Sequence, residues 1–295
     1  GILDRELIDL GRESEKTLSA VAQTPSSALG SVRQKPSADE CRQIIDVLKA
    51  FDVRYFFYIG GNDTAEAAYI FSQEARRSKY DFACFHIPKT VDNDLRQNDH
   101  TPGFGSSARF VAHAFMGDNL DNRALGGVKI NVVMGRNAGF LTAASALARQ
   151  FPDDGPHLIY LPERPFAVSR FVSDVKRVLK QHGRCVVAVS EGIIDSRGQL
   201  LAARFPSEKD SHGNVTLGGS GAMGDHLASI VKARTSASRV RADTLGYMQR
   251  SFPGLASEVD SREAADVAAA AVNFATRGIR SGSAAIKRAA GKRYK

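Results

Sequence analysis

Cysteine is scarce in this sequence, with Cys41, Cys84 and Cys185 the three among 295 residues. They are odd in number, far apart and set in apolar or amphipathic stretches, so buried thiols are a better interpretation than a disulfide framework or a zinc knuckle. Long hydrophobic runs are also missing, because no segment approaches the roughly 20 apolar residues of a membrane span. We therefore expect a cytoplasmic protein without a membrane partner, built as one large or two ordinary domains.

Negative charge is missing from the end of the chain. No acidic residue follows Asp266, whereas lysines and arginines continue to Lys295 and supply most of the net charge of +8. An arm that binds nucleic acid usually interleaves such cations with aromatic side chains that stack on bases, and only Tyr294 is available here. We therefore expect a solvated, alanine-rich basic helix and no nucleic-acid partner; a nucleic-acid arm is the alternative.

Internal repeats and low-complexity linkers are absent, and strand and helix patterns alternate through the middle of the chain. Ser37 and Glu40 form a capping-box pattern ahead of an amphipathic helix. Short apolar runs and helical periodicity then follow one another. The predicted strands cover residues 53–59, 82–87, 128–134, 157–161 and 184–189, and the later helices 65–77, 106–115, 140–149, 168–180 and 225–232. This alternation predicts an α/β fold with parallel sheets covered by helices.

Clusters of glycine, acidic and basic residues come directly after all five predicted strands. One such cluster could be an ordinary polar turn, but the carboxyl ends of parallel strands share one edge of a sheet, where α/β proteins bind ligands. Five clusters at such edges favour an active-site cleft. The clusters are Gly60–Thr64, Pro88–Asp94, Gly135–Gly139, Pro162–Glu163 and Ser190–Gly192.

The segment from Ile87 to Asp94 contains residues suited to handling phosphate. One of its carboxylates could take a proton from an attacking hydroxyl, and the other could hold a metal ion. Lys89 could neutralise phosphate charge. In the other clusters, glycine pairs allow backbone N–H groups to approach an anion, a guanidinium binds phosphate, and a carboxylate accepts hydrogen bonds from a polyol. A phosphorylated sugar would suit the last group, formed by Arg241, Tyr247 and Arg250.

In order and spacing these motifs resemble those of the phosphofructokinase family, in particular its pyrophosphate-dependent members. The resemblance runs through Leu29–Arg33, Gly60–Thr64, Pro88–Asp94, Met134–Arg136, Ser190–Gly192 and Leu245–Arg250. It implies reversible transfer of a phosphoryl group from pyrophosphate to the 1-hydroxyl of fructose 6-phosphate, giving fructose 1,6-bisphosphate, with Mg²⁺ required.

The resemblance also implies an architecture of two Rossmann-like, three-layer domains with mainly parallel sheets and the active site in the cleft between them. Residues 1–103 with 250–295 would form the phosphoryl-donor domain, and residues 104–249 the sugar-phosphate domain. A homo-oligomer with shared sites is expected, in which Arg241 reaches the site of a neighbouring subunit.

Roles for individual residues follow from the same resemblance. Asp92 would be the base that takes the proton from the sugar hydroxyl, and Arg33 would steady the phosphoryl group in flight. Asp94 and Asn62 would manage the magnesium ion. The donor would be held by Gly60, Gly61, Asp63 and Lys89, of which Asp63 and Lys89 also count among the catalytic residues. The sugar site would be lined by Thr90, Val91, Asp92, Met134, Gly135, Arg136 and Glu191, with Tyr247 and Arg250 on its phosphate.

Two of these residues point to pyrophosphate as the donor. ATP-using members resemble Gly-Gly-Asp-Gly at the first loop, where this chain has Asn62-Asp63. A carboxylate on Asp63 would occupy the space of the nucleotide's inner phosphate and repel it. ATP-using members also commonly carry glycine where Lys89 stands, and an ammonium group here would neutralise charge on the transferred group.

Other interpretations stay open. The family's opening glycine turn is not found ahead of Arg33, and the basic end leads into no further strand, so we expect a fragment with little activity of its own. Gly219–Gly224 matches a dinucleotide fingerprint, but the segment before it is polar and the region near Asp243 does not suggest a clean strand, which disfavours an NAD(P) enzyme. An ATP-dependent phosphofructokinase and a non-catalytic subunit of the same fold are the remaining alternatives.

Overall fold

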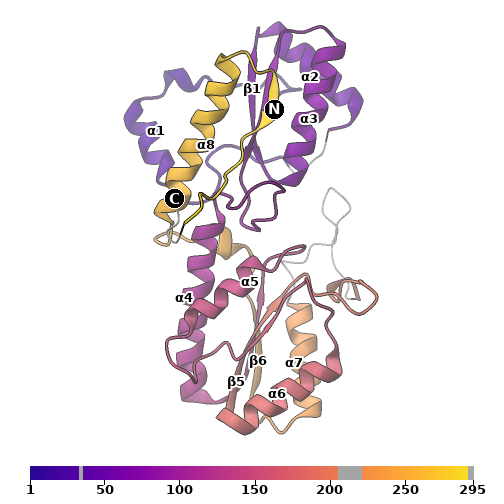
Figure 1. Ribbon diagram of the computed structural model, residues 1–295, viewed down its shortest axis with the longest axis vertical. Helices are drawn as coiled ribbons and strands as arrows, with labels where there is room; N and C mark the ends of the chain where they lie inside the picture. The colour runs from indigo at the N-terminus through magenta and orange to yellow at the C-terminus, as the bar shows by residue number, and fades with distance from the viewer. Residues whose placement is uncertain (33–35, 205–220, 292–295) are drawn as a thin grey trace. The chain divides into compact units, whose positions relative to one another are not determined.

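The computed structural model describes residues 1–32, 36–204 and 221–291 (Figure 1). The chain divides into two compact units. Unit 1 consists of Gly1–Thr90, Asp94–Gly103 and Glu258–Lys295, and unit 2 consists of Val91–Asn93 and Phe104–Ser257. The domain limits expected from the sequence differ from these at residues 91–93 and 250–257, which belong to unit 2.

Unit 1 is built on a parallel sheet in the order β1-β2-β7, formed by Tyr55–Gly60, Ala83–Pro88 and Ser281–Ser283. Helices α2 (Ala38–Ala50) and α3 (Asn62–Arg77) pack on one face, and α8 (Glu258–Thr276) packs on the other (Figure 1). Because side chains alternate along a strand, Cys84 of β2 joins the α2–α3 core while Phe85 joins the core under α8. The outcome is a helix–sheet–helix sandwich, as the sequence predicted.

Two shorter helical segments precede α2 in unit 1. They are a 3₁₀ turn at Leu10–Arg12 and helix α1 at Glu15–Ala22, and neither contains a buried residue. Helix α2 begins with the predicted capping box: Ser37 Oγ accepts from the Glu40 N–H, and the Glu40 carboxylate accepts from the Ser37 N–H. This reciprocal bonding satisfies two of the N–H groups that a helix start leaves open.

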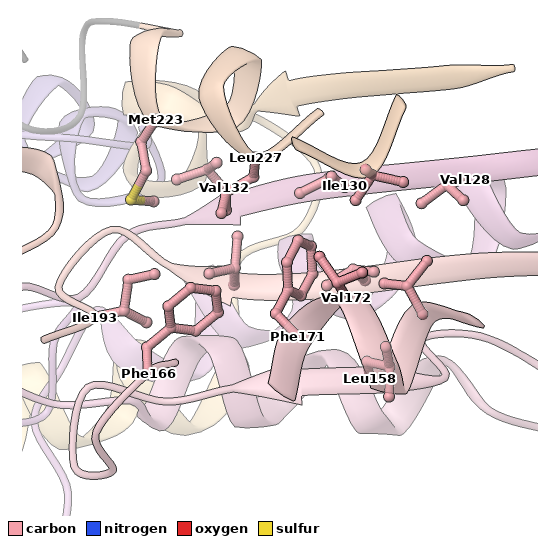
Figure 2. Close-up of a cluster of buried hydrophobic side chains, with 14 of the residues drawn as sticks. Val128, Ile130, Val132, Leu158, Phe166, Phe171, Val172, Ile193, Met223 and Leu227 are labelled. Carbon is pink, nitrogen blue, oxygen red and sulfur yellow. The ribbon is translucent and has the colours of Figure 1, made fainter. Parts of the chain in front are cut away.

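Unit 2 contains a parallel sheet in the order β4-β5-β3-β6. Its strands are Leu158–Tyr160, Arg184–Ser190, Gly127–Val133 and Val240–Thr244 respectively. One face carries α6 (Val168–His182) and α7 (Ala222–Arg234), and Figure 2 shows Val128, Ile130 and Val132 of β3 in the core with Phe171 and Leu227 from these helices. The other face is covered by α4 (Phe104–Leu125) and α5 (Phe140–Ala144), the latter followed by a 3₁₀ turn at Ser145–Ala148. Further 3₁₀ turns lie at Ala202–Arg204 and Gly246–Arg250.

Two expectations about secondary structure were wrong. A strand does form near Asp243, because β6 pairs in parallel with β3 at one edge of the sheet, where it can alternate a buried Val240 with an exposed Arg241. The basic end is not helical over residues 277–291. Helix α8 stops at Thr276, and the chain turns into β7, with Arg280 paired to Asp81.

Within the three described ranges, no helix combines the length and apolar character that crossing a membrane requires.

Candidate active site

In unit 1, the ends of two neighbouring strands bring the expected donor residues together. Gly60 of β1 is in register with Pro88 of β2, and the N–H of Lys89 donates to the Gly60 carbonyl at 3.0 Å. A Cβ placed on Gly60 would lie 2.0 Å from Thr64 Oγ1, so this position has room only for glycine. The loop from Gly60 therefore passes closely against the segment that carries Lys89.

Helix α3 starts three residues earlier than the sequence predicted, so Asn62 and Asp63 lie in its first turn and not in a loop. Gly61 is the N-cap residue, and no side chain caps this end. The first N–H groups of a helix carry a partial positive charge and attract anions. The protein itself places a negative charge at this helix end, the exposed carboxylate of Asp63. Its position in the first turn also favours the helix itself, through the macrodipole.

Asp94 and Asn62, the expected magnesium residues, contact each other in unit 1. Asn62 Nδ2 donates to Asp94 Oδ2 at 3.1 Å, and burial raises the pKa of the Asp94 carboxyl above its usual range. Among the described residues no group of three or more His, Cys, Asp or Glu side chains is arranged to hold a metal ion. A carboxylate and an amide oxygen are ligand types that Mg²⁺ accepts, because this ion takes few protein ligands and completes its shell with water and substrate phosphate; Asn62 would have to turn its oxygen, in place of Nδ2, toward the ion.

The remaining unit 1 residue of the expected site is Thr90. It is half-buried and forms a parallel β-bridge with Gly103. This bridge connects the segment after Lys89 to the residue that directly precedes α4. Arg33, expected to steady the phosphoryl group, lies outside the described residues. So do Gly219 and Ser220, the first two residues of the stretch Gly219–Gly224 considered for a dinucleotide.

In unit 2, the loops after β3 and β5 interlock. Ser190 Oγ donates to the Gly135 carbonyl at 2.7 Å, and the Gly135 N–H donates to Glu191 Oε1 at 3.3 Å. Gly135 has a φ of +131°, and a Cβ there would lie 2.4 Å from the Ala138 carbonyl oxygen, so both backbone angle and space require glycine. These contacts hold Met134, Gly135 and Arg136 against Glu191.

Glu191 is the most perturbed carboxyl of this group. It is 8 % exposed, and burial raises its pKa to about 7. The negative charge of Asp92 acts in the same direction, while the Gly135 N–H and the Arg136 guanidinium partly oppose it. Asp92, Arg136 and Glu191 therefore sense each other's charge within unit 2. A carboxyl that titrates near neutrality beside a second carboxylate is typical of a functional site.

Replacement of Glu191 by glutamine is expected to stabilise unit 2 above neutral pH. Below pH 4.5 the carboxyl is protonated in both the folded and unfolded states. As the pH rises to 7, the unfolded state ionises first, so the native glutamate lowers stability by an amount that grows to about 3 kcal/mol and then stays constant. Glu191→Gln keeps an oxygen to accept from Gly135 and removes this loss.

Urea unfolding of both proteins between pH 4 and pH 8 measures the effect. The midpoint difference should be near zero at pH 4 and should grow up to pH 7. A difference that does not change with pH would contradict a buried, protonated Glu191.

The residues expected to bind the sugar phosphate lie at the surface of unit 2. Arg250 stacks over the ring of Tyr247, with 4.4 Å from its guanidinium carbon to the ring centroid. Both belong to the 3₁₀ turn Gly246–Arg250 and are exposed. Arg241 is exposed on the edge strand β6, and its Nη1 donates to the Val240 carbonyl at 3.0 Å. Val91, in contrast, is half-buried against the core beneath α4.

Gln249 connects this turn to the rest of the unit 2 site, a role that sequence reasoning missed. It is 2 % exposed, its Oε1 accepts from the Met134 N–H at 3.2 Å, and its Nε2 donates to the Gly246 carbonyl at 2.9 Å. Its own carbonyl accepts from the Ser107 hydroxyl at 2.7 Å. The one signal in the sequence is its position inside the Leu245–Arg250 motif, which does not reveal that the side chain points inward.

Comparison with known proteins gives the family of the chain. The sequence model of the phosphofructokinase family matches residues 1–275, so the chain belongs to the phosphofructokinase family.

Several relatives of high similarity share one enzyme name. A pyrophosphate–fructose 6-phosphate 1-phosphotransferase of Rhodospirillum rubrum is 58% identical over 290 residues, which cover 98% of this chain and 72% of the relative. An enzyme of the same name from Xanthomonas campestris is 40% identical and is covered to 72% by the whole of this chain. A crystal structure of a pyrophosphate-dependent phosphofructokinase from Marinobacter aquaeolei aligns with a TM-score of 0.85 at 34% identity, over 100% of this chain and 69% of that one. The chain thus spans about seven-tenths of the length of these relatives.

Proposed function

We propose that this protein transfers a phosphoryl group reversibly between pyrophosphate and the 1-hydroxyl of fructose 6-phosphate. The observation that carries the proposal is the 58% identity, over 98% of the chain, to a relative named for this reaction. The residues at the strand ends of both units support it, because they supply a base, anion-binding backbone and cationic side chains.

Asp92 is the proposed base. It removes the proton of the 1-hydroxyl, whose oxygen then forms a bond to the terminal phosphorus of pyrophosphate as the bond to the bridging oxygen breaks, releasing phosphate. Arg136 lies close enough to influence Glu191 electrostatically and supplies positive charge on the sugar side. Glu191, with its pKa near 7, accepts or donates hydrogen bonds to sugar hydroxyls according to its protonation state.

We assign the rest of the sugar site to Thr90, Val91, Met134 and Gly135. Tyr247 and Arg250 hold the sugar phosphate, since a planar guanidinium and a phenol both donate to phosphate oxygens. Arg241 reaches the site of a neighbouring subunit in a homo-oligomer; its exposure on an edge strand is compatible with such a role. Arg33 steadies the transferring group.

The donor site lies at the start of α3. Gly60 and Gly61 bring backbone N–H groups close to the anion, and the uncapped helix end adds positive potential. Asp63 already places a negative charge in this first turn, so a nucleotide's additional phosphate is repelled while the smaller pyrophosphate is accepted. Lys89 directly follows the last residue of β2, which pairs with Gly60, and its ammonium group neutralises charge on the transferred group.

Magnesium belongs to this proposal through Asp94 and Asn62. The partly buried carboxylate of Asp94 would supply an oxygen ligand, and Asn62 would supply its Oδ1 in place of the Nδ2 that donates to Asp94. The chemistry that these residues would bring in with the ion is neutralisation of charge on the phosphate oxygens.

A donor comparison on the protein in its full natural length tests the function. We expect fructose 1,6-bisphosphate to form with pyrophosphate at least 100-fold faster than with ATP at equal concentrations, both with excess Mg²⁺. Faster turnover with ATP would identify an ATP-dependent phosphofructokinase. Binding of fructose 6-phosphate without transfer from either donor would identify a non-catalytic subunit of the same fold.

A further inference from the structure

The buried histidine His86 occupies a central position in the sheet of unit 1. It is 2 % exposed and lies on the middle strand β2, between the end of β1 at Gly60, which belongs to the donor region, and the end of β7 at Ser283. Its Nε2 lies 2.9 Å from the Gly60 carbonyl oxygen, and its Nδ1 lies 2.7 Å from Ser283 Oγ on β7. The ring thus links all three strands of this sheet.

The hydrogen-bond partners determine the protonation of the ring. A carbonyl can only accept, so Nε2 carries the hydrogen and donates to Gly60. Nδ1 of the neutral ring then accepts the hydroxyl hydrogen of Ser283 at 2.7 Å, in preference to the Ala284 carbonyl oxygen, which lies 3.2 Å from the same hydroxyl. Burial lowers the pKa of His86, which keeps the ring neutral at physiological pH.

The Gly60 carbonyl is where the two donor segments meet. It accepts from His86 Nε2 and also from the Lys89 N–H at 3.0 Å. In a trans peptide the carbonyl and the following N–H point in opposite directions, so fixing the Gly60 oxygen also fixes the direction of the Gly61 N–H. Gly61 has no side chain to anchor it and is the residue from which α3 starts.

We propose that His86 is a positioning residue for the phosphoryl donor: it holds the Gly60–Gly61 peptide and the Lys89 backbone in the orientation that binds pyrophosphate. The inference rests on the proposed function and adds a residue outside the resemblance-based site. His86 touches no substrate itself. It acts through Gly60, and Ser283 acts through His86 by holding the tautomer.

Steady-state kinetics of three variants in the full-length protein test the proposal. His86→Leu removes both hydrogen bonds and should raise KM for pyrophosphate about 10-fold, while KM for fructose 6-phosphate changes less than about 2-fold. His86→Gln places an amide N–H near the former Nε2 and should restore most of the loss. Ser283→Ala leaves the bond to Gly60 possible and should raise KM for pyrophosphate about 2–3-fold.

Cys84→Ala is the matched control for stability. Cys84 is buried on the same face of β2, two residues earlier, and reaches neither Gly60 nor Lys89 by a hydrogen bond of its side chain. It should lower thermal stability without changing KM for pyrophosphate. If His86→Leu and Cys84→Ala alter KM for both substrates equally, His86 is a packing residue and the proposal fails.

Two further outcomes are separable. If His86→Leu does not fold, the other two variants still test the positioning role of His86. An unchanged KM for pyrophosphate in Ser283→Ala, together with a 10-fold rise of that KM in His86→Gln, would contradict both expected results and overturn the role. If the unmodified protein does not use pyrophosphate, the proposed function has failed before any variant is compared.

Discussion

Replacement of Asp92 by asparagine is expected to lower kcat about 10³-fold, with KM for both substrates changing only a few-fold. Asparagine has nearly the same shape but cannot take the proton of the sugar hydroxyl, and a positioned general base contributes 10²- to 10⁴-fold. Initial rates with saturating pyrophosphate and fructose 6-phosphate measure the loss. Asp121→Asn, the same change at an exposed position of α4, should leave the rate within about 2-fold.

The same variant gives a second, independent signal. Asp92 helps to raise the pKa of Glu191, so removing its charge should lower that pKa from about 7. The pH dependence of fructose 6-phosphate binding should then move to lower pH in Asp92→Asn. A kcat within 10-fold of the unmodified protein, or an unshifted binding profile, would contradict the assignment of Asp92 as base and neighbour of Glu191.

The double replacement Asp63→Gly with Lys89→Gly is expected to lower kcat/KM for pyrophosphate about 10³-fold. An ammonium about 4 Å from a phosphate charge, at an effective dielectric near 20, is worth about 4 kcal/mol. If that interaction is felt mainly in the transition state, its loss corresponds to about three powers of ten in rate. The glycine at position 63 should also remove the repulsion of a nucleotide phosphate.

Donor preference in the two single variants and the double variant separates the contributions. Lys89→Gly should account for most of the loss with pyrophosphate, and Asp63→Gly for any gain with ATP. Asp63 lies in the first turn of α3, just after β1, and Lys89 directly follows the neighbouring strand β2, so we expect their effects not to be additive, and the double-mutant cycle measures the coupling. Persistence of pyrophosphate activity without any rise in ATP use would contradict this account of donor choice.

The sequence predicted the order of strands and helices well wherever the local signal was strong. The Ser37–Glu40 capping box and the apolar run of β2 are examples, and both are confirmed. Helix α4 is much longer than predicted because its second half buries Asn119 and Asn122, which break the apolar periodicity. Both amide oxygens accept from Arg184, and Asn119 also donates to Asp154; these partners are distant in the chain, so local patterns cannot reveal them.

The site was predictable where it depends on the strong local signal of strands and helices. Strand-end placement of Gly60, Lys89, Gly135 and Glu191 follows from alternation of strands and helices and is confirmed. The functional roles given to these residues stay predictions. Buried polar residues that hold the site by hydrogen bonds, such as Gln249, were missed because their contacts depend on tertiary structure.

The tight fit around Gly60 has a consequence for how donor preference can change. No side chain can be added at that glycine without displacing Thr64, so the peptide framework of the loop is fixed by sterics. Asp63 and Lys89 are exposed, so exchanging them opens no cavity in the core, and loss of the Asp63 charge from the first turn of α3 costs about 0.3–1 kcal/mol. If the two side chains have the proposed roles, selection for a different phosphoryl donor can exchange them at a cost of about 1 kcal/mol in stability, so related proteins with this fold can come to use different donors through point substitutions.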